Sequence, residues 1–222
     1  MIKKDTQGVT FAKGFTAAGV KAGIKKSGNL DVAVIYTKTQ AVVAGTFTQN
    51  KVAAAPVYVS KEVVATGTAH AIVANAGCAN ACTGQQGLDD AHKMAQIAAD
   101  ELGVNADDVI VGSTGVIGVN LPMDKLEAGI KDAVANLSAD GSDNAGRAII
   151  TTDTHSKSVT CEFELSGKTV RMGAIAKGSG MIRPNMATML CYITTDIAID
   201  QALLQKAVSG CVEKSFNMIS VD

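Results

Sequence analysis

The 222-residue sequence contains no tryptophan, and aromatic residues make up only 4% of it. Proteins that bind single-stranded nucleic acid stack bases on such side chains, so this class lacks its usual platform here. Lysine and arginine (20) do not outnumber aspartate and glutamate (21), which leaves no basic field for nucleic acid or an anionic membrane. No run approaches the roughly 18 apolar residues of a membrane-spanning helix. We expect neither a nucleic-acid partner nor a membrane partner.

Cysteines are few and scattered, and no secretion signal precedes them. The chain has five, an odd number, and its first residues (MIKKDTQGVTFAKGF) lack an apolar stretch of signal-peptide length. We therefore predict a reducing, cytoplasmic setting. Cys78 and Cys82 stand four residues apart, but no second pair or nearby histidine completes a metal-binding set. The sequence predicts no metal site.

What is present indicates a globular protein, with 47% hydrophobic and 18% charged residues. Helical spacing predicts helices over 88–102 and 123–137, and a third that begins after Asp200 as its N-cap. The polar segment 138–144 (SADGSDN) is typical of a surface loop. Alternating apolar residues predict strands at 31–37, 41–48, 71–75, 108–112, 158–165, 169–176 and 189–195. This order predicts an α/β (α+β) fold, a layered sandwich of β-sheets covered by helices.

Three glycine-rich loops follow predicted strands: NAGCANACTG (75–84), GSTGVIG (112–118) and KGSGMI (177–182). None contains a dinucleotide fingerprint or a phosphate-binding loop, and each alone is more typical of a tight turn than of a ligand site. Loop 112–118 is the best candidate, because its strand, glycines and hydroxyl residue together expose backbone N–H groups. Such groups can stabilise an oxyanion.

A conventional nucleophile is missing. The serine elbow GxSxG is absent, and the histidines at 70, 92 and 155 stand in unrelated segments where a polar surface position is the plainer interpretation. A Ser-His-Asp or Cys-His enzyme therefore finds little support.

Threonine is a weak nucleophile unless a base lies beside it. An amino-terminal threonine supplies that base itself, because its α-amine has a pKa of about 7.7–8.0. The bond between Ala187 and Thr188 follows a loop that contains two glycines and Pro184, a position suited to a strained, self-cleaving peptide bond. Spacing alone leaves open that Thr188 merely begins a buried strand.

The segment AKGSGMIRPNMATMLCYITTD (176–196) resembles the self-cleaving loop of the ornithine acetyltransferase / glutamate N-acetyltransferase family of arginine biosynthesis. Other family-like motifs precede it in the same order: GVTFAKGFTAAGVKAGIK, TFTQNKVAAAPV, NAGCANACTG, STGVIG and TTDTHSK. The resemblance spans nearly the whole chain. It implies the fold shared by self-processing aminopeptidases and ornithine acetyltransferases, in proteins close to twice this length.

The resemblance also implies how the chain divides. Residues 1–222 would form a single, truncated domain, cleaved between Ala187 and Thr188. Residues 1–187 would be the first (alpha) subunit, and residues 188–222 the start of the second (beta) subunit. Two subunits of each kind would form a heterotetramer in the full-length protein.

Family roles carry over where the motifs match. Thr188 corresponds to the nucleophile, and Thr114 with Gly115 corresponds to the pair that stabilises the oxyanion, in agreement with the interpretation of loop 112–118. The expected substrate contacts are Thr154, Lys177 and Thr188, with Thr151 and Thr152 as close alternatives to Thr154. A lysine suits this role because it offers a point charge to an amino-acid carboxylate.

The implied reaction moves an acetyl group from N2-acetyl-L-ornithine to L-glutamate through acetyl-Thr188, with no metal or organic cofactor. Some family members also accept acetyl-CoA, and the sequence leaves open whether this one does. Two alternatives remain: a self-processing amidohydrolase or aminopeptidase with water as acceptor, and a non-catalytic α/β binding module. The related hydrolases usually present a serine, and the ATML junction argues against them.

Overall fold

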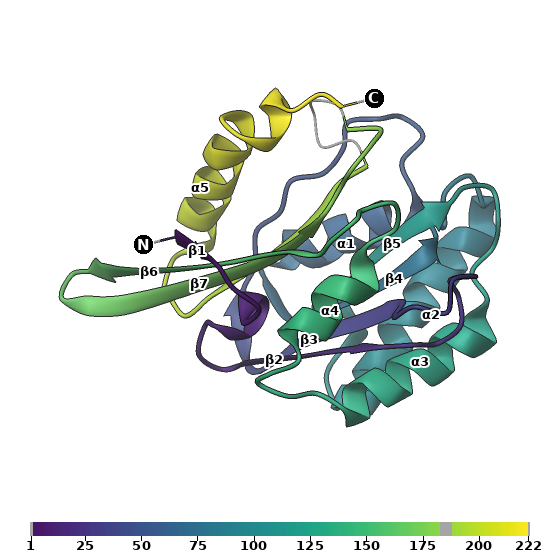
Figure 1. The fold of residues 1–222 in the computed structure, drawn as a ribbon, viewed down its shortest axis with the longest axis horizontal. Helices are drawn as coiled ribbons and strands as arrows, with labels where there is room; N and C mark the ends of the chain where they lie inside the picture. Colours follow the sequence, from purple (N-terminus) through teal and green to yellow (C-terminus); the bar gives the residue numbers. More distant parts are fainter. Residues whose placement is uncertain (1, 183–187, 222) are drawn as a thin grey trace.

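The computed structural model describes residues 2–182 and 188–221, and their strands form two four-stranded sheets (Figure 1). The first sheet has the order β2 (Phe15–Val20), β3 (Val32–Val42), β4 (Thr68–Cys78), β5 (Val109–Val116). The β2–β3 and β3–β4 pairs are antiparallel, whereas β4 and β5 run parallel. The second sheet is antiparallel throughout, in the order β1 (Ile2–Lys4), β6 (Lys157–Leu165), β7 (Lys168–Lys177), β8 (Leu190–Thr195).

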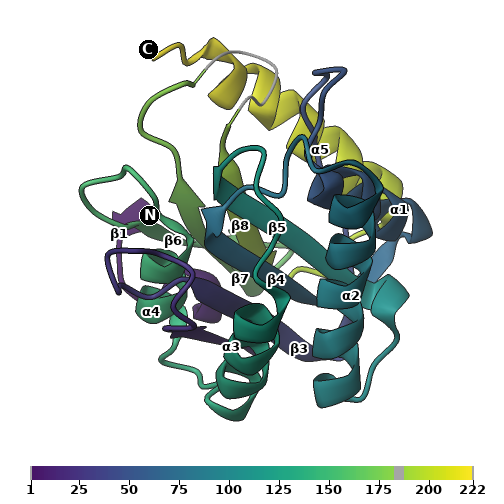
Figure 2. The same ribbon diagram turned by 90° about the vertical axis from the view of Figure 1, so that its right-hand side faces the viewer.

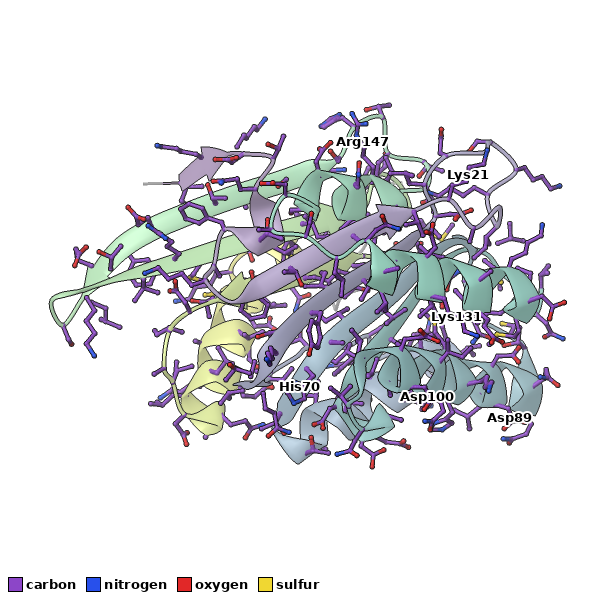
Figure 3. All side chains as sticks on the ribbon, turned by 90° about the horizontal axis from the view of Figure 1, so that it is seen from below. Lys21, His70, Asp89, Asp100, Lys131 and Arg147 are labelled. Atoms are coloured by element: carbon purple, nitrogen blue, oxygen red, sulfur yellow. The ribbon has the colours of Figure 1, made fainter. Side chains whose placement is uncertain are left out.

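Three helices cover the outer face of the first sheet (Figure 2): α1 (Ala55–Thr66), α2 (Gly84–Leu102) and α3 (Met123–Ala135). Their apolar faces and the sheet bury a core of mostly alanine and branched side chains, among them Val32, Val73, Ala98, Leu126 and Ile130. Charged residues occupy the opposite faces, such as Asp89 and Asp100 on α2 and Lys131 on α3 (Figure 3). Helical periodicity therefore separates core from solvent as the sequence predicts.

A second core lies between the two sheets. Helix α4 (Ser142–Ile149) contributes Ala145, Ala148 and Ile149, which pack with inward-facing residues of both sheets. The prediction of a surface loop over 138–144 is wrong for residues 142–144, which belong to α4. Helix α4 begins at Ser142, which is fully buried. Its hydroxyl accepts a hydrogen bond from the N–H of Val9 at 2.9 Å, which compensates for the burial.

The remaining elements are α5 (Gln201–Glu213) and three short 3-10 helices, η1 (Gly8–Thr10), η2 (Ala106–Asp108) and η3 (Phe216–Met218). Asp200 is confirmed as the N-cap of α5, because its carboxylate accepts from the N–H groups of Ala202 and Leu203. Helix α5 lies alongside the second sheet (Figure 1). Among the described residues, no helix is both long and apolar enough to cross a membrane.

The expected sandwich of sheets and helices is confirmed, but the strand expected at 41–48 is not. Its first two residues belong to β3, whose register against β4 shifts between Tyr36 and Ala41. Residues 43–48 form no strand. At Gly45 the side chain of Gln205 from α5 takes the place of a neighbouring strand, with hydrogen bonds of 3.1 and 3.0 Å to the backbone.

Ser60 should contribute to stability by linking α1 to β5, the edge strand of its sheet. The buried hydroxyl donates to the carbonyl of Val111 at 2.6 Å and accepts from the N–H of Val111 at 3.0 Å. Ser60→Ala leaves both backbone groups unpaired, and we expect urea unfolding of the full-length protein to show a loss of about 1–3 kcal/mol. Ser215→Ala, which removes an exposed hydrogen bond, should change stability by no more than about 0.5 kcal/mol. Equal stability of the two variants would contradict this role.

Candidate active site

Lys177 lies at the centre of the candidate site. It ends β7 and is only 6% exposed. Its ammonium donates hydrogen bonds to Oγ1 of Thr114 at 3.1 Å and to the carbonyl oxygen of Thr188 at 3.2 Å. Burial lowers the pKa of Lys177; the charge of Asp153 opposes this shift, and that of Lys157 adds to it. The structure thus brings together three of the residues that the sequence predicts: Thr114, Lys177 and Thr188.

The two sheets approach closely beneath these residues. A Cβ atom on Gly112 of β5 would lie 2.1 Å from the hydroxyl oxygen of Tyr192 on β8, so only glycine leaves room for that ring. Burial raises the pKa of Tyr192, which keeps the hydroxyl neutral, and raises the pKa of the neighbouring Cys191 to about 11. A thiol with this pKa is protonated at neutral pH and a poor nucleophile.

Loop 112–118 is anchored to loop 75–84, the glycine-rich loop that follows β4. Gly115 pairs with Gly77 across the two parallel strands, and a Cβ atom on Gly115 would lie 2.4 Å from the carbonyl carbon of Gly77. The buried Asn75 accepts a hydrogen bond from Ser113 at 2.6 Å and donates one to the carbonyl of Cys78 at 3.0 Å. Loop 75–84 therefore supports loop 112–118, which fixes the backbone around Thr114.

Thr188 is exposed and has a φ of 59°, in the left-handed region. A β-branched residue is a genuine outlier in that region, and such strain costs of order 1–3 kcal/mol. Its hydroxyl donates a hydrogen bond to the carbonyl of Met181. Ala187, the other half of the predicted cleavage site, lies outside the described residues.

The described contacts do not connect Thr154 with Thr114, Lys177 or Thr188. Thr154 is exposed, and its Oγ1 lies 3.1 Å from Nδ1 of His155. Its neighbour Asp153 instead is buried, pairs with Lys157 and accepts a hydrogen bond from the N–H of Gly178 at 2.9 Å. Sequence reasoning missed Asp153, although the motif TTDTHSK contains it.

The arrangement provides the parts needed for acyl transfer. Thr188 presents a hydroxyl, Lys177 offers a buried positive charge, and Thr114 places a second hydroxyl against that ammonium. Within residues 2–182 and 188–221, no three His, Cys, Asp or Glu side chains gather into a metal-binding group.

Residues 16–222 match the model of the ArgJ family. The chain belongs to the ArgJ family. Among curated members, the arginine biosynthesis bifunctional protein ArgJ of Symbiobacterium thermophilum is 51% identical over 217 residues, which are 97% of this chain and 54% of that protein. The chain thus spans about half the length of the curated ArgJ relatives that it matches.

Solved structures give the same family and a wider fold relationship. The ornithine acetyltransferase of Mycobacterium tuberculosis, solved in complex with ornithine, is 42% identical with a TM-score of 0.77; the match covers 86% of this chain and 100% of that one. An L-aminopeptidase D-Ala-esterase/amidase from Ochrobactrum anthropi, described as a variant of the Ntn hydrolase fold, matches with a TM-score of 0.54 at 12% identity over 94% of this chain and 69% of that one. The second likeness concerns the fold alone. The expected family and fold are confirmed.

Two glycines of loop 112–118 should differ in their tolerance of a side chain. Both have positive φ, 136° at Gly115 and 78° at Gly118, but a Cβ atom on Gly118 meets nothing within 4 Å. Gly118→Ala should cost about 1–2 kcal/mol, the usual strain of this conformation. Gly115→Ala should cost about 1–3 kcal/mol more, because the backbone of Gly77 would have to move. Urea unfolding measures both, and similar losses would contradict the close contact.

Proposed function

We propose that the full-length protein transfers the acetyl group of N2-acetyl-L-ornithine to L-glutamate through an ester on Thr188. The observation that carries the proposal is the meeting of Thr114, Lys177 and Thr188 around one buried ammonium group. Membership of the ArgJ family supports it, as does the family relative that was solved with ornithine. The reaction draws on the protein's own residues and uses neither a metal nor an organic cofactor.

We infer that self-cleavage precedes transfer. Oγ of Thr188 attacks the carbonyl carbon of Ala187, the peptide C–N bond breaks, and an ester links the two residues. Water hydrolyses this ester, which leaves a carboxylate on Ala187 and a free α-amine on Thr188. The strained φ of Thr188 supports cleavage here. The Mycobacterium tuberculosis structure supports it too. The match covers all of that chain but only 86% of this one, so that chain is shorter than residues 1–222. The products are residues 1–187 and a second subunit that begins at residue 188.

In the transfer step, the freed α-amine of Thr188 takes the proton of its own hydroxyl, and Oγ attacks the acetyl carbonyl. The Thr114 hydroxyl and the N–H at Gly115 stabilise the oxyanion, where one such donor is typically worth about 100- to 1,000-fold in turnover. The amine of ornithine leaves with a proton. The amine of glutamate then attacks the ester and carries the acetyl group away.

Lys177 serves both half-reactions in this scheme. Ornithine and glutamate each carry an α-carboxylate, and a buried ammonium group attracts such a group more strongly than an exposed one does. Lys177 works below its lowered pKa, where it is protonated. Thr154 joins it as a substrate contact in this proposal. Use of acetyl-CoA, a heterotetramer of two alpha and two beta subunits, and a cytoplasmic location stay predictions.

Two other functions lead to different products. A hydrolase of the aminopeptidase type would transfer the acetyl group to water and release acetate, and a binding module would remain one uncleaved chain. The fold likeness to the Ochrobactrum anthropi enzyme does not decide between them, because one fold hosts many activities. The threonine at position 188 favours transfer over the serine aminopeptidases.

Variants at Thr188 test the proposal directly. In the full-length protein, Thr188→Ala should remain a single chain without transfer activity, because the hydroxyl oxygen attacks in both steps. Thr188→Ser keeps that oxygen and should cleave and retain part of the activity. The exposed Thr169→Ala, on the β6–β7 hairpin, is the control and should behave like the wild type.

Gel electrophoresis, amino-terminal sequencing and a transfer assay provide the measurements. The second fragment should begin Thr-Met-Leu-Cys. A different starting residue, or acetyl transfer by the Thr188→Ala variant, would rule out the assigned nucleophile.

A further inference from the structure

Asp153 is a buried carboxylate beside the site to which the proposed mechanism gives no task. Its side chain is fully buried in the loop between α4 and β6, whereas that of its ion-pair partner, Lys157, is 40% exposed. Oδ1 receives hydrogen bonds from Lys157 and from the N–H of Gly178, the latter at 2.9 Å. A buried carboxylate is costly unless several partners compensate it. Its position next to Lys177 therefore requires an explanation.

We propose that Asp153 is a positioning residue, which fixes the end of β7 through the amide of Gly178 so that Lys177 points at Thr114 and Thr188. This inference rests on the proposed function and deepens it. Asp153 touches no reacting atom in the scheme and acts through the lysine that does.

The geometry of the strand ends supports this role. Pairing of β7 with β8 ends at Lys177 and Leu190. The chain therefore loses its strand-to-strand hydrogen bonds directly after Lys177. Gly178 is the next residue, and its N–H finds Asp153 in place of a strand. Lys157 begins β6 and pairs with Ala176 of β7. One carboxylate therefore holds both strands of the hairpin at the end that faces the site.

The charge of Asp153 supplies a second means of action. Burial alone would raise the pKa of Asp153, but hydrogen bonds from Lys157 and Gly178 outweigh it, and the lowered pKa keeps the group ionised at neutral pH. Among the described residues, the charged groups that act on Lys177 are Asp153, which raises its pKa, and Lys157, which lowers it. Asp153 thus helps to keep Lys177 protonated despite its burial.

An ordinary structural ion pair is the competing explanation, and it predicts that Asp153 and Lys157 matter equally. The test compares Asp153→Ala, Asp153→Asn and Lys157→Gln in the full-length protein. Asp143→Asn is the matched control, since it breaks a more exposed pair on α4, in which Asp143 lies 3.2 Å from Nε of Arg147. Arg147 is labelled in Figure 3. The measurements are kcat and KM for N-acetylornithine across pH, and the rate of self-cleavage.

Asp153→Ala loses the anchor of Gly178, and kcat/KM should fall by about 100-fold, as expected for a misplacement near 1 Å. Self-cleavage should slow as well, because Gly178 begins the segment that leads to Thr188. Asp153→Asn keeps an oxygen for the Gly178 amide, so kcat near neutral pH should stay within about tenfold of the wild type. Asp143→Asn should match the wild type throughout.

The pH profiles separate the two explanations. Lys177 must be protonated, so activity falls as pH rises through its pKa. Asp153→Asn removes the group that raises this pKa, and the alkaline limb should move to lower pH. Lys157→Gln removes the group that lowers it, and the limb should move to higher pH. An ion pair that only stabilised the loop, without influence on Lys177, would shift neither limb.

Unchanged profiles, or shifts in the same direction, would overturn the proposal, and so would wild-type kinetics in Asp153→Ala. If Asp153→Ala does not fold, the profiles of the other two variants still decide. A wild-type enzyme that never transfers acetyl from N-acetylornithine would instead overturn the proposed function. The self-cleavage rates of the variants would then still test the anchor.

Discussion

The candidate site depends on the hydrogen bonds that the buried ammonium group of Lys177 makes to Thr114 and Thr188. A buried cation requires hydrogen-bond acceptors. One acceptor, Thr114, lies on β5 of the first sheet, and the other, Thr188, comes just before β8 of the second sheet. The end of β5 in one sheet and the end of β7 in the other must therefore meet. Small residues make this possible: Gly112 admits the ring of Tyr192, and Gly115 lies against Gly77.

Secondary structure could be predicted from the sequence where periodicity was strong. The segments now seen as α2, α3, β6 and β7 have clear apolar spacing. Strand β2 (FTAAGV) was missed because alanine and glycine carry little strand signal, and its form depends on pairing with β3. Helix α1 contains valines that favour strands, and α4 starts among Ser, Asp and Asn. The secondary structure of β2, α1 and α4 therefore depends on tertiary packing more than on local sequence.

Part of the candidate site could be predicted from sequence motifs, without help from periodicity. Motifs pointed to Thr114, Lys177 and Thr188, and the structure gathers them although Thr114 and Lys177 are 63 residues apart. Asp153 could not be found in this way, because its importance depends on where β7 ends and on which amide is left without a strand partner. Thr154 shows the reverse case: its motif was recognised, but the described contacts leave it exposed beside His155.

The central claim is that acetyl transfer passes through an ester on Thr188. Full-length protein that has cleaved itself can be incubated with N-acetylornithine in the absence of glutamate and then analysed by mass spectrometry. The fragment that begins at Thr188 should carry one added acetyl group, on Thr188 itself, and should lose it to glutamate as N-acetylglutamate forms. An active, processed enzyme that never carries this acetyl group, even after rapid quenching, would contradict the account.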